Sequence, residues 1–156
     1  MTPPVLAYVF WHTPADGADV GAYAEALVRW HAALAAREAV IVSATWQLTD
    51  GAPWIPSWTG PVFEDWYLVA DWEALGQLER DAVSPALRAD HDHASVRAAD
   101  GVAGVWRGPD FLPGDGLTWT DVAPDTDAAA WRRCLTLGPA PQYAIDRPGG
   151  PARVRL

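Results

Sequence analysis

The chain contains no lysine, only one cysteine and no apolar run long enough to cross a membrane. A bilayer-spanning helix needs about 20 mostly apolar residues, so we expect no transmembrane segment. A single cysteine cannot form an intrachain disulfide, which suits a reducing compartment, and we expect Cys134 to be a buried, apolar thiol. The first four residues lack the basic and apolar regions of a secretory signal, so the expected location is the cytoplasm.

Positive charge is scarce as well. All 11 basic residues are arginines, and they stand against 20 acidic residues, which gives a formal net charge of −9. Proteins that bind nucleic acid usually present a basic patch or stripe, and this sequence has none. The same deficit disfavours attraction to an anionic membrane surface. We therefore expect neither nucleic acid nor membrane as a partner. Nucleotide-binding glycine motifs and the serine-hydrolase motif are also missing.

Tryptophan is the residue in excess, with ten copies in 156 residues, a length that fits one domain. A buried indole needs a partner for its N–H group. Such an excess predicts an aromatic core, an aromatic-lined pocket or a large interface. The ten positions are Trp11, Trp30, Trp46, Trp54, Trp58, Trp66, Trp72, Trp106, Trp119 and Trp131.

The first 107 residues predict the order strand, helix, strand, strand, helix, strand. β-branched and aromatic runs predict strands over 5–12, 39–48, 62–70 and 101–107. Helical spacing of apolar residues predicts a helix over 19–37, a helical piece from Trp72 capped by Asp71, and a second piece over 85–99 capped by Ser84. This order is typical of an α+β, ferredoxin-like βαββαβ fold, with an antiparallel sheet and the helices on one face.

The predicted strands are apolar on both sides, so the sheet face away from the helices must also be buried. In a short chain the simplest cover is a second copy, and we therefore expect a homodimer.

Residues 109–156 are interrupted by proline and glycine, and they hold too few periodic apolar residues for a core of their own. They predict a short helix over 127–136 with Trp131 and Leu135 pointing inward, a short strand over 142–146 and an irregular tail from 147. We assign residues 1–108 to the ferredoxin-like α/β domain. Residues 109–156 are interpreted as a C-terminal extension that wraps around the same domain.

Three segments carry a resemblance to a known group of proteins: Phe10-Trp11-His12, the helix face with Tyr23, Leu27, Trp30, His31 and Leu34, and the stretch from Glu64 to Leu75. They resemble the dimeric α/β-barrel superfamily over about residues 5–107. That superfamily includes cofactor-free antibiotic-biosynthesis monooxygenases, polyketide cyclases, EthD-like proteins, haem-degrading enzymes and stress-responsive barrel proteins. The resemblance implies that two protomers pack their free sheet faces into a barrel, with a small-molecule pocket between sheet and helices. Its haem-degrading members combine a polar residue on the first strand, a tryptophan on the third strand and an iron-ligating histidine on the second helix. The resemblance implies His12, Trp66 and His91 for these three roles.

The most informative polar residues lie on the predicted strands. Period-2 alternation places Asp65 and Tyr67 on one face of the third strand, and Glu64 and Trp66 on the other. A buried acid needs a partner. Each carboxylate therefore either anchors an arginine or an indole N–H, or acts as a general acid or base with His12 or His91.

Four candidate catalytic residues follow, namely His12, Asp65, Tyr67 and His91. Candidate ligand-binding residues are Trp11, His31, Trp54, Trp58, Glu64 and Trp66. Trp54 and Trp58 lie in the proline- and glycine-rich loop 50–61, where they could stack on a flat ligand or a sugar. We expect no metal site, because His91 and His93 point to different sides of a helix.

These residues favour a small-molecule-binding protein, and the sequence leaves its activity open. One hypothesis is an enzyme without a cofactor, either a monooxygenase or a cyclase/isomerase, acting on a small organic substrate, aromatic ones included. A second is a haem-binding protein that uses His91. A third is a dimeric ligand-binding or stress-response protein without catalysis.

Overall fold

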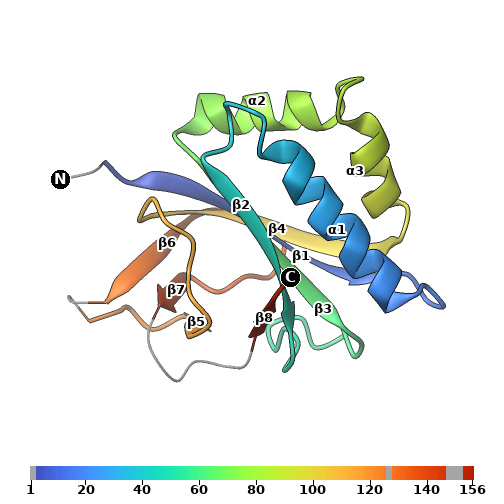
Figure 1. The fold of residues 1–156 in the computed structure, drawn as a ribbon. Coiled ribbons are helices and arrows are strands. Elements are labelled where there is room, and N and C mark those ends of the chain that lie inside the picture. The colour runs from blue at the N-terminus through green and yellow to red at the C-terminus, as the bar shows by residue number, and fades with distance from the viewer. Residues whose placement is uncertain (1–2, 126–127, 147–152) are drawn as a thin grey trace.

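The computed structural model describes residues 3–125, 128–146 and 153–156 (Figure 1). Its strands are β1 (Val5–Pro14), β2 (Val42–Leu48), β3 (Val62–Val69), β4 (Ala98–Gly108), β5 (Leu117–Thr120), β6 (Ala129–Leu137), β7 (Tyr143–Asp146) and β8 (Arg153–Arg155). Its helices are α1 (Val20–Leu34), α2 (Trp72–Ala82) and α3 (Arg88–Ser95). The strands form one antiparallel sheet of eight, in the order β5-β7-β6-β4-β1-β3-β2-β8. Among the described residues, no helix is long and apolar enough to cross a membrane.

The prediction of a ferredoxin-like βαββαβ fold was wrong. The protein is mostly an antiparallel sheet of eight strands that curls into a half-barrel, and four of those strands come from residues beyond 108. β6, β7 and β5 extend the sheet past β4, while β8 adds to the opposite edge beside β2. Figure 1 shows these later strands folded back on the side of the sheet away from the helices.

The concave side of the half-barrel is filled by tryptophan. Trp11, Trp46, Trp66, Trp106 and Trp131 are each at most 1% exposed. Trp119 of β5 completes the cluster, with its ring centroid 4.9 Å from that of Trp11 and 5.7 Å from that of Trp66. Alternate strand residues are small where the indoles need room. A side chain at Gly108, for example, would meet the ring of Trp131.

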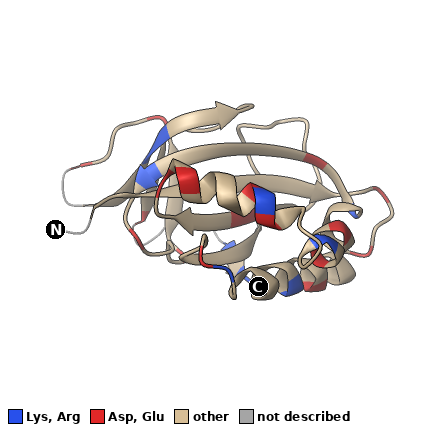
Figure 2. Ribbon diagram, turned by 90° about the horizontal axis from the view of Figure 1, so that it is seen from above, with Lys and Arg blue, Asp and Glu red and all other residues tan. Residues whose placement is uncertain are grey.

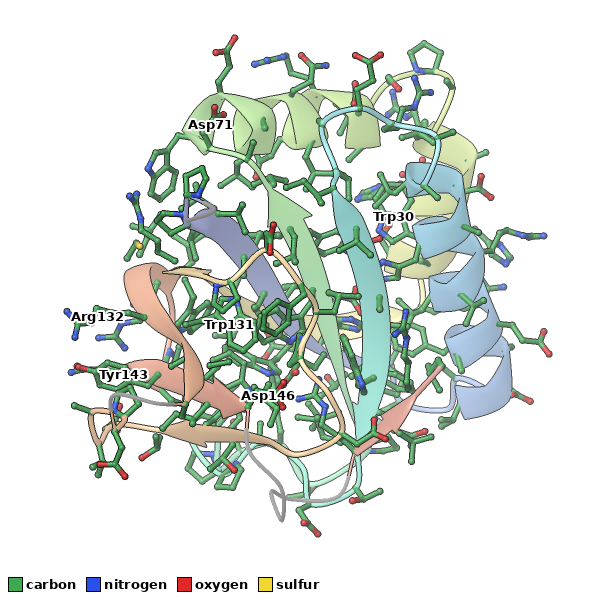
Figure 3. The ribbon with its side chains drawn as sticks, turned by 60° about the vertical axis from the view of Figure 1, so that its left-hand side comes forward. Trp30, Asp71, Trp131, Arg132, Tyr143 and Asp146 are labelled. Atoms are coloured by element: carbon green, nitrogen blue, oxygen red, sulfur yellow. The ribbon has the colours of Figure 1, made fainter. Side chains whose placement is uncertain are left out.

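This tryptophan core removes the reason for expecting a dimer. The second sheet face is apolar, as predicted, but the chain covers it with its own C-terminal strands and with the loop after β2. Trp54 of that loop lies against Trp11, with 5.0 Å between the ring centroids. Figure 3 shows Trp131 turned toward the interior, whereas Arg132 and Tyr143 lie at the outer side of the extension.

Glu64 lies fully buried at the centre of the tryptophan core. Its Oε2 atom accepts from the indole nitrogens of Trp11 at 2.9 Å and Trp119 at 2.8 Å. Its Oε1 atom accepts from the indole of Trp66 at 2.7 Å and lies 2.8 Å from Nη2 of Arg153. Residues of β1, β3, β5 and β8 therefore converge on one carboxylate, which ties both edges of the sheet to its middle.

Arg153 supplies the balancing positive charge. The residue is 7% exposed, and its guanidinium carbon lies 4.4 Å from the ring centroid of Trp46. A buried ion needs both charge pairing and close packing to offset its lost hydration. β8 is short, and this ion pair gives a physical reason for its attachment to the sheet edge.

The helices cover the other face of the sheet, and Asp71 caps α2 as predicted. Asp19 accepts from the amide of Ala22 at 2.9 Å before α1, and Asp71 accepts from the amide of Ala74 at 2.9 Å before α2. Aromatic and aliphatic residues of α1 and α2 pack there against β1 and β3. Most charged residues of the helices are exposed, and Figure 2 marks their positions along the ribbons.

Three local predictions were wrong. Residues 129–137 form strand β6 rather than a helix, and Leu135 is 47% exposed rather than inward. Trp131 and Leu135 are four residues apart, a spacing that puts both on one face of a helix and also of a regular strand. The pairing of β6 with β4 shifts register between Val105 and Trp106, and only Trp131 reaches the core. Cys134 on this strand is exposed, not buried. Residues 126–127 of the predicted helix lie outside the described residues.

The other differences concern element ends. Ser84 does not cap a helix at residue 85; its hydroxyl donates to the Asp81 carbonyl at 2.6 Å, and α3 begins at Arg88. The short strand expected over 142–146 is confirmed as β7. Within the expected irregular tail, residues 153–155 form β8, and residues 147–152 lie outside the described residues.

Replacing Glu64 with glutamine tests its role as the centre of the core. We expect Glu64→Gln to lower the free energy of unfolding by about 3 kcal/mol or more, because Arg153 is left buried without its counter-charge. The new amide N–H₂ would also face indole donors. Urea denaturation followed by tryptophan fluorescence measures the change. The matched control is Glu73→Gln on exposed α2 surface, expected within about 0.5 kcal/mol of the wild type. Equal stability of the two variants would contradict the assignment.

Candidate functional site

A cavity of about 390 Å³ lies between the helix-covered face of the sheet and the three helices. Strand residues form its floor, α1 and α2 form its sides, and α3 contributes His91. Its described lining residues are mostly aromatic or aliphatic, and they are Tyr8, Phe10, His12, Tyr23, Leu27, Trp30, Asp65, Tyr67, Leu75, Leu78, Glu79, Ala82, Val83, His91, Ala94, Ser95 and Ala98. Ligand pockets typically combine apolar walls with a few convergent polar groups, and this cavity has both.

Asp65 lies at the floor of the cavity, 2% exposed, between two histidines. Its Oδ2 atom lies 3.0 Å from Nε2 of His12, and its Oδ1 atom lies 3.6 Å from Nε2 of His31. The Tyr67 hydroxyl donates to Oδ2 at 3.1 Å, and itself accepts from the indole of Trp30 at 3.0 Å. Trp30 lies between α1 and the sheet in Figure 3.

The two histidine contacts are close without being well-directed hydrogen bonds. Among the described residues, both Nε2 atoms and Asp65 Oδ1 lack a hydrogen-bond partner of good geometry. Each ring nevertheless lies against the carboxylate, with Nε2 of His12 at 3.0 Å and Nε2 of His31 at 3.6 Å. This leaves hydrogen-bonding capacity at the buried centre of the site, whereas Glu64 on the opposite face is saturated with donors.

Each histidine contacts a hydroxyl group through its other ring nitrogen. His12 Nδ1 is hydrogen-bonded to the Tyr23 hydroxyl, and His31 Nδ1 lies 2.8 Å from Oγ of Ser43. Asp65, His12 and Tyr23 thus form a continuous polar chain, and Tyr23 and His12 both line the cavity. A carboxylate on one imidazole nitrogen fixes which nitrogen carries the proton, and so prepares the other to accept one.

The charge states follow from burial and neighbours. Burial alone would raise the pKa of Asp65, but the charge and contacts of His12 and of His31 outweigh it and hold that pKa well below its usual range. Burial, followed by the charge of Asp65, raises the pKa of Tyr23 and of Tyr67 well above its ordinary value. Burial, then Glu79 and Asp65, raises the pKa of Tyr8 to about 12. Asp65 is therefore ionised at neutral pH, and these tyrosines are neutral hydroxyls.

The structure gathers the candidate catalytic residues at this cavity. His12, Asp65, Tyr67 and His91 all line it. His91 is the most open of them: its side chain is 38% exposed, with its ring 5.3 Å from that of Trp30. The sequence did not single out Tyr23, because its helical spacing with Leu27 and Trp30 makes it look like a core residue. Its phenol oxygen, in the first turn of α1, was the available signal.

The candidate ligand-binding residues lie elsewhere. Trp11, Glu64 and Trp66 belong to the tryptophan core on the opposite face, and Trp54 packs against that core from the loop. His31 touches Asp65 behind the cavity wall. Trp58 lines a separate recess of about 340 Å³ near the β1–α1 turn, and its indole donates to Asp100 at 3.2 Å.

The three residues that the resemblance implies for haem binding do not lie in one site. His12 and His91 line the cavity, but Trp66 is fully buried on the other side of the sheet, bonded to Glu64. The cause is strand alternation, since Trp66 follows Asp65 directly and must face the opposite way. Within the described ranges, no group of three or more His, Cys, Asp or Glu side chains could hold a metal ion.

Comparisons with known proteins gave no relative. No protein-family model matches the chain, and searches of curated proteins and of solved structures found no significant match. Function is therefore inferred from the geometry of the cavity.

The lowered pKa of Asp65 predicts how acid affects stability. An aspartate whose folded pKa lies below its unfolded value of about 3.9 contributes stability that is fully present above that pH and is lost as pH falls toward the folded pKa. We expect the unfolding free-energy difference between wild type and Asp65→Asn to be about 3 kcal/mol near neutrality and to shrink below about pH 4.

Urea titrations at a series of pH values measure that difference, with Asp110→Asn on the exposed surface as the control. The control is expected to follow the wild type throughout. A difference that stays constant down to pH 2 would show that Asp65 is not held ionised by its histidine neighbours.

Proposed function

We propose that the protein binds a small, mostly apolar organic molecule in the 390 Å³ cavity and catalyses a proton transfer on it without a cofactor. The reaction class is isomerisation or cyclisation: a C–H or O–H proton is removed at one position and a proton is returned at another. Such a reaction is balanced in atoms and electrons, so no oxidant or reductant is required. The observation that carries the proposal is the chain Asp65–His12–Tyr23, which ends at the cavity.

Tyr23 is the group that meets the substrate in this proposal. Its raised pKa, caused first by burial and then by Asp65, means that it is a neutral hydroxyl at rest. When its oxygen accepts a substrate proton, its own proton passes to His12 Nδ1. The imidazolium that forms is stabilised by Asp65, 3.0 Å away. Reversal of the relay returns the proton.

The remaining polar residues hold this relay in place. Trp30 and Tyr67 fix the carboxylate of Asp65 from the other side, through hydrogen bonds of 3.0 and 3.1 Å. The rings of Phe63 and Phe10 both stack on that of His12, with centroids 5.9 and 5.0 Å away. A catalytic group works best when its rotamer is locked by packing and by a second layer of hydrogen bonds.

The proposal is tested with a substrate whose reaction needs only a base. In 5-nitrobenzisoxazole, removal of the ring C–H proton forms a nitrile as the N–O bond breaks, and the leaving electron pair ends on a coloured phenolate. We expect the wild type to accelerate this opening. We also expect His12→Gln to lower kcat/KM by about 100-fold, the lower range of general acid–base contributions. Tyr23→Phe is expected to lose activity to a similar degree.

His93→Gln is the matched control, because His93 lies on the same helix as His91 but does not line the cavity. It is expected to retain the wild-type rate. Equal kcat/KM values for wild type and His12→Gln would refute the relay. A Tyr23→Phe variant that is fully active would show that His12 meets the substrate directly.

A further inference from the structure

The charges around the cavity indicate which ligands it can hold. Of the described residues that line it, two carry a carboxylate, Asp65 at the floor and Glu79 on α2, and none is an arginine. The chain has no lysine. A carboxylate or phosphate ligand would therefore enter without a fixed cation to pair with. The imidazole of His12, held against Asp65, is already opposed by a carboxylate.

The arginines of the three helices have partners outside the cavity lining. Arg80 on α2 donates to the Gln77 side chain from Nε at 3.2 Å and from Nη2 at 2.9 Å. Arg29 on α1 lies 4.0 Å from Asp90, and Arg88 on α3 lies 3.6 Å from Asp92. None of the partners Gln77, Asp90 and Asp92 lines the cavity.

Aromatic faces replace fixed cations around the cavity. Tyr8 and Tyr67 lie 5.7 Å apart between ring centroids on neighbouring strands, and Phe10 continues the row along β1. Trp30 and His91 close the side toward α3. The π faces of such rings attract a positive charge, and the attraction grows when the charge is removed from water. Glu79 and Asp65 line the same cavity as these rings, and after burial their charges add to the raised pKa of Tyr8.

Glu79 is positioned to meet the charged end of a ligand. It shares one face of α2 with Leu75, Leu78 and Ala82, all of which line the cavity. Glu79 is exposed while Leu78 beside it is buried, so the carboxylate lies toward the opening. Asp65, surrounded by histidines, lies at the floor.

From this arrangement we propose that the cavity selects small organic cations, that is amines or quaternary ammonium compounds, with the cationic group between Tyr8 and Glu79 and the apolar part toward Trp30. The proposed cation selectivity concerns the same cavity as the proposed function, and it rests on that proposal for the location of the site alone. Binding of a cation does not require the proton relay.

Three molecules of nearly the same shape test the proposal. Choline carries a trimethylammonium group, 3,3-dimethylbutan-1-ol has a neutral carbon in place of the nitrogen, and 3,3-dimethylbutanoate is an anion. Isothermal titration of each into the wild-type protein at neutral pH measures the affinities. We expect choline to bind at least about tenfold more tightly than the neutral alcohol, as a partly desolvated cation–π contact allows, and the anion to bind most weakly.

Two variants locate the binding. Glu79→Gln is expected to weaken choline binding about threefold, since one exposed charge contributes little, and to leave the neutral alcohol unchanged. Glu73→Gln on the same helix, outside the cavity lining, is the control and should match the wild type. Tyr8→Leu should lower choline affinity more than alcohol affinity. Near-ultraviolet circular dichroism confirms that each variant is folded.

The outcomes separate the two proposals. Three results would each overturn the cation selectivity. They are equal affinity for choline and the alcohol, stronger binding of the anion, and no detectable binding of choline at millimolar concentrations. None of these results changes the expected loss of 5-nitrobenzisoxazole opening in His12→Gln, because that substrate is uncharged. Conversely, cation selectivity without any acceleration by the wild type would support this inference and refute the relay.

Discussion

Two adjacent carboxylates in the middle of β3 are removed from water, and the pleat of the strand sends them to opposite faces of the sheet. Glu64 enters the tryptophan core, where three indoles and Arg153 surround it. Asp65 enters the cavity floor, where it lies between His12 and His31. Buried charge is tolerated only with partners. The position of each carboxylate therefore fixes the residues around it, and the rest of the structure is arranged about these two centres.

The two carboxylates differ in how much hydrogen-bonding capacity remains around them. Both oxygens of Glu64 are occupied and no lining residue of the large cavity lies on its face, so its role is to hold β5 and β8 to the central strands. Around Asp65 the contacts are close but poorly directed, and the polar chain continues through His12 to Tyr23 at an open cavity. Perturbed titratable groups in a cleft are characteristic of functional sites. Glu64 thus accounts for the fold and Asp65 for the proposed chemistry.

How much the sequence reveals depends on whether the signal is local. Strand alternation placed Glu64 and Asp65 on opposite faces, and side-chain capping located the start of α2 at Asp71. Cover for the second sheet face could not be predicted, because β8 pairs with β2 across more than 100 residues of chain. Trp131 and Leu135 fit a helical spacing as well as a strand, and only long-range pairing with β4 decides between them. Tyr23 was overlooked for a related reason, since a phenol on an apolar helix face looks like core until its partner His12 is seen.

The protonation of His12 is the most direct test of the account. Long-range ¹H–¹⁵N NMR correlations report which imidazole nitrogen carries the proton when the ring is neutral. We predict a proton on Nε2, facing Asp65, and an unprotonated Nδ1 that accepts from Tyr23, with this preference lost in Asp65→Asn. A neutral His12 protonated at Nδ1, and unaffected by Asp65→Asn, would contradict the proposal that the carboxylate prepares this ring to accept a proton.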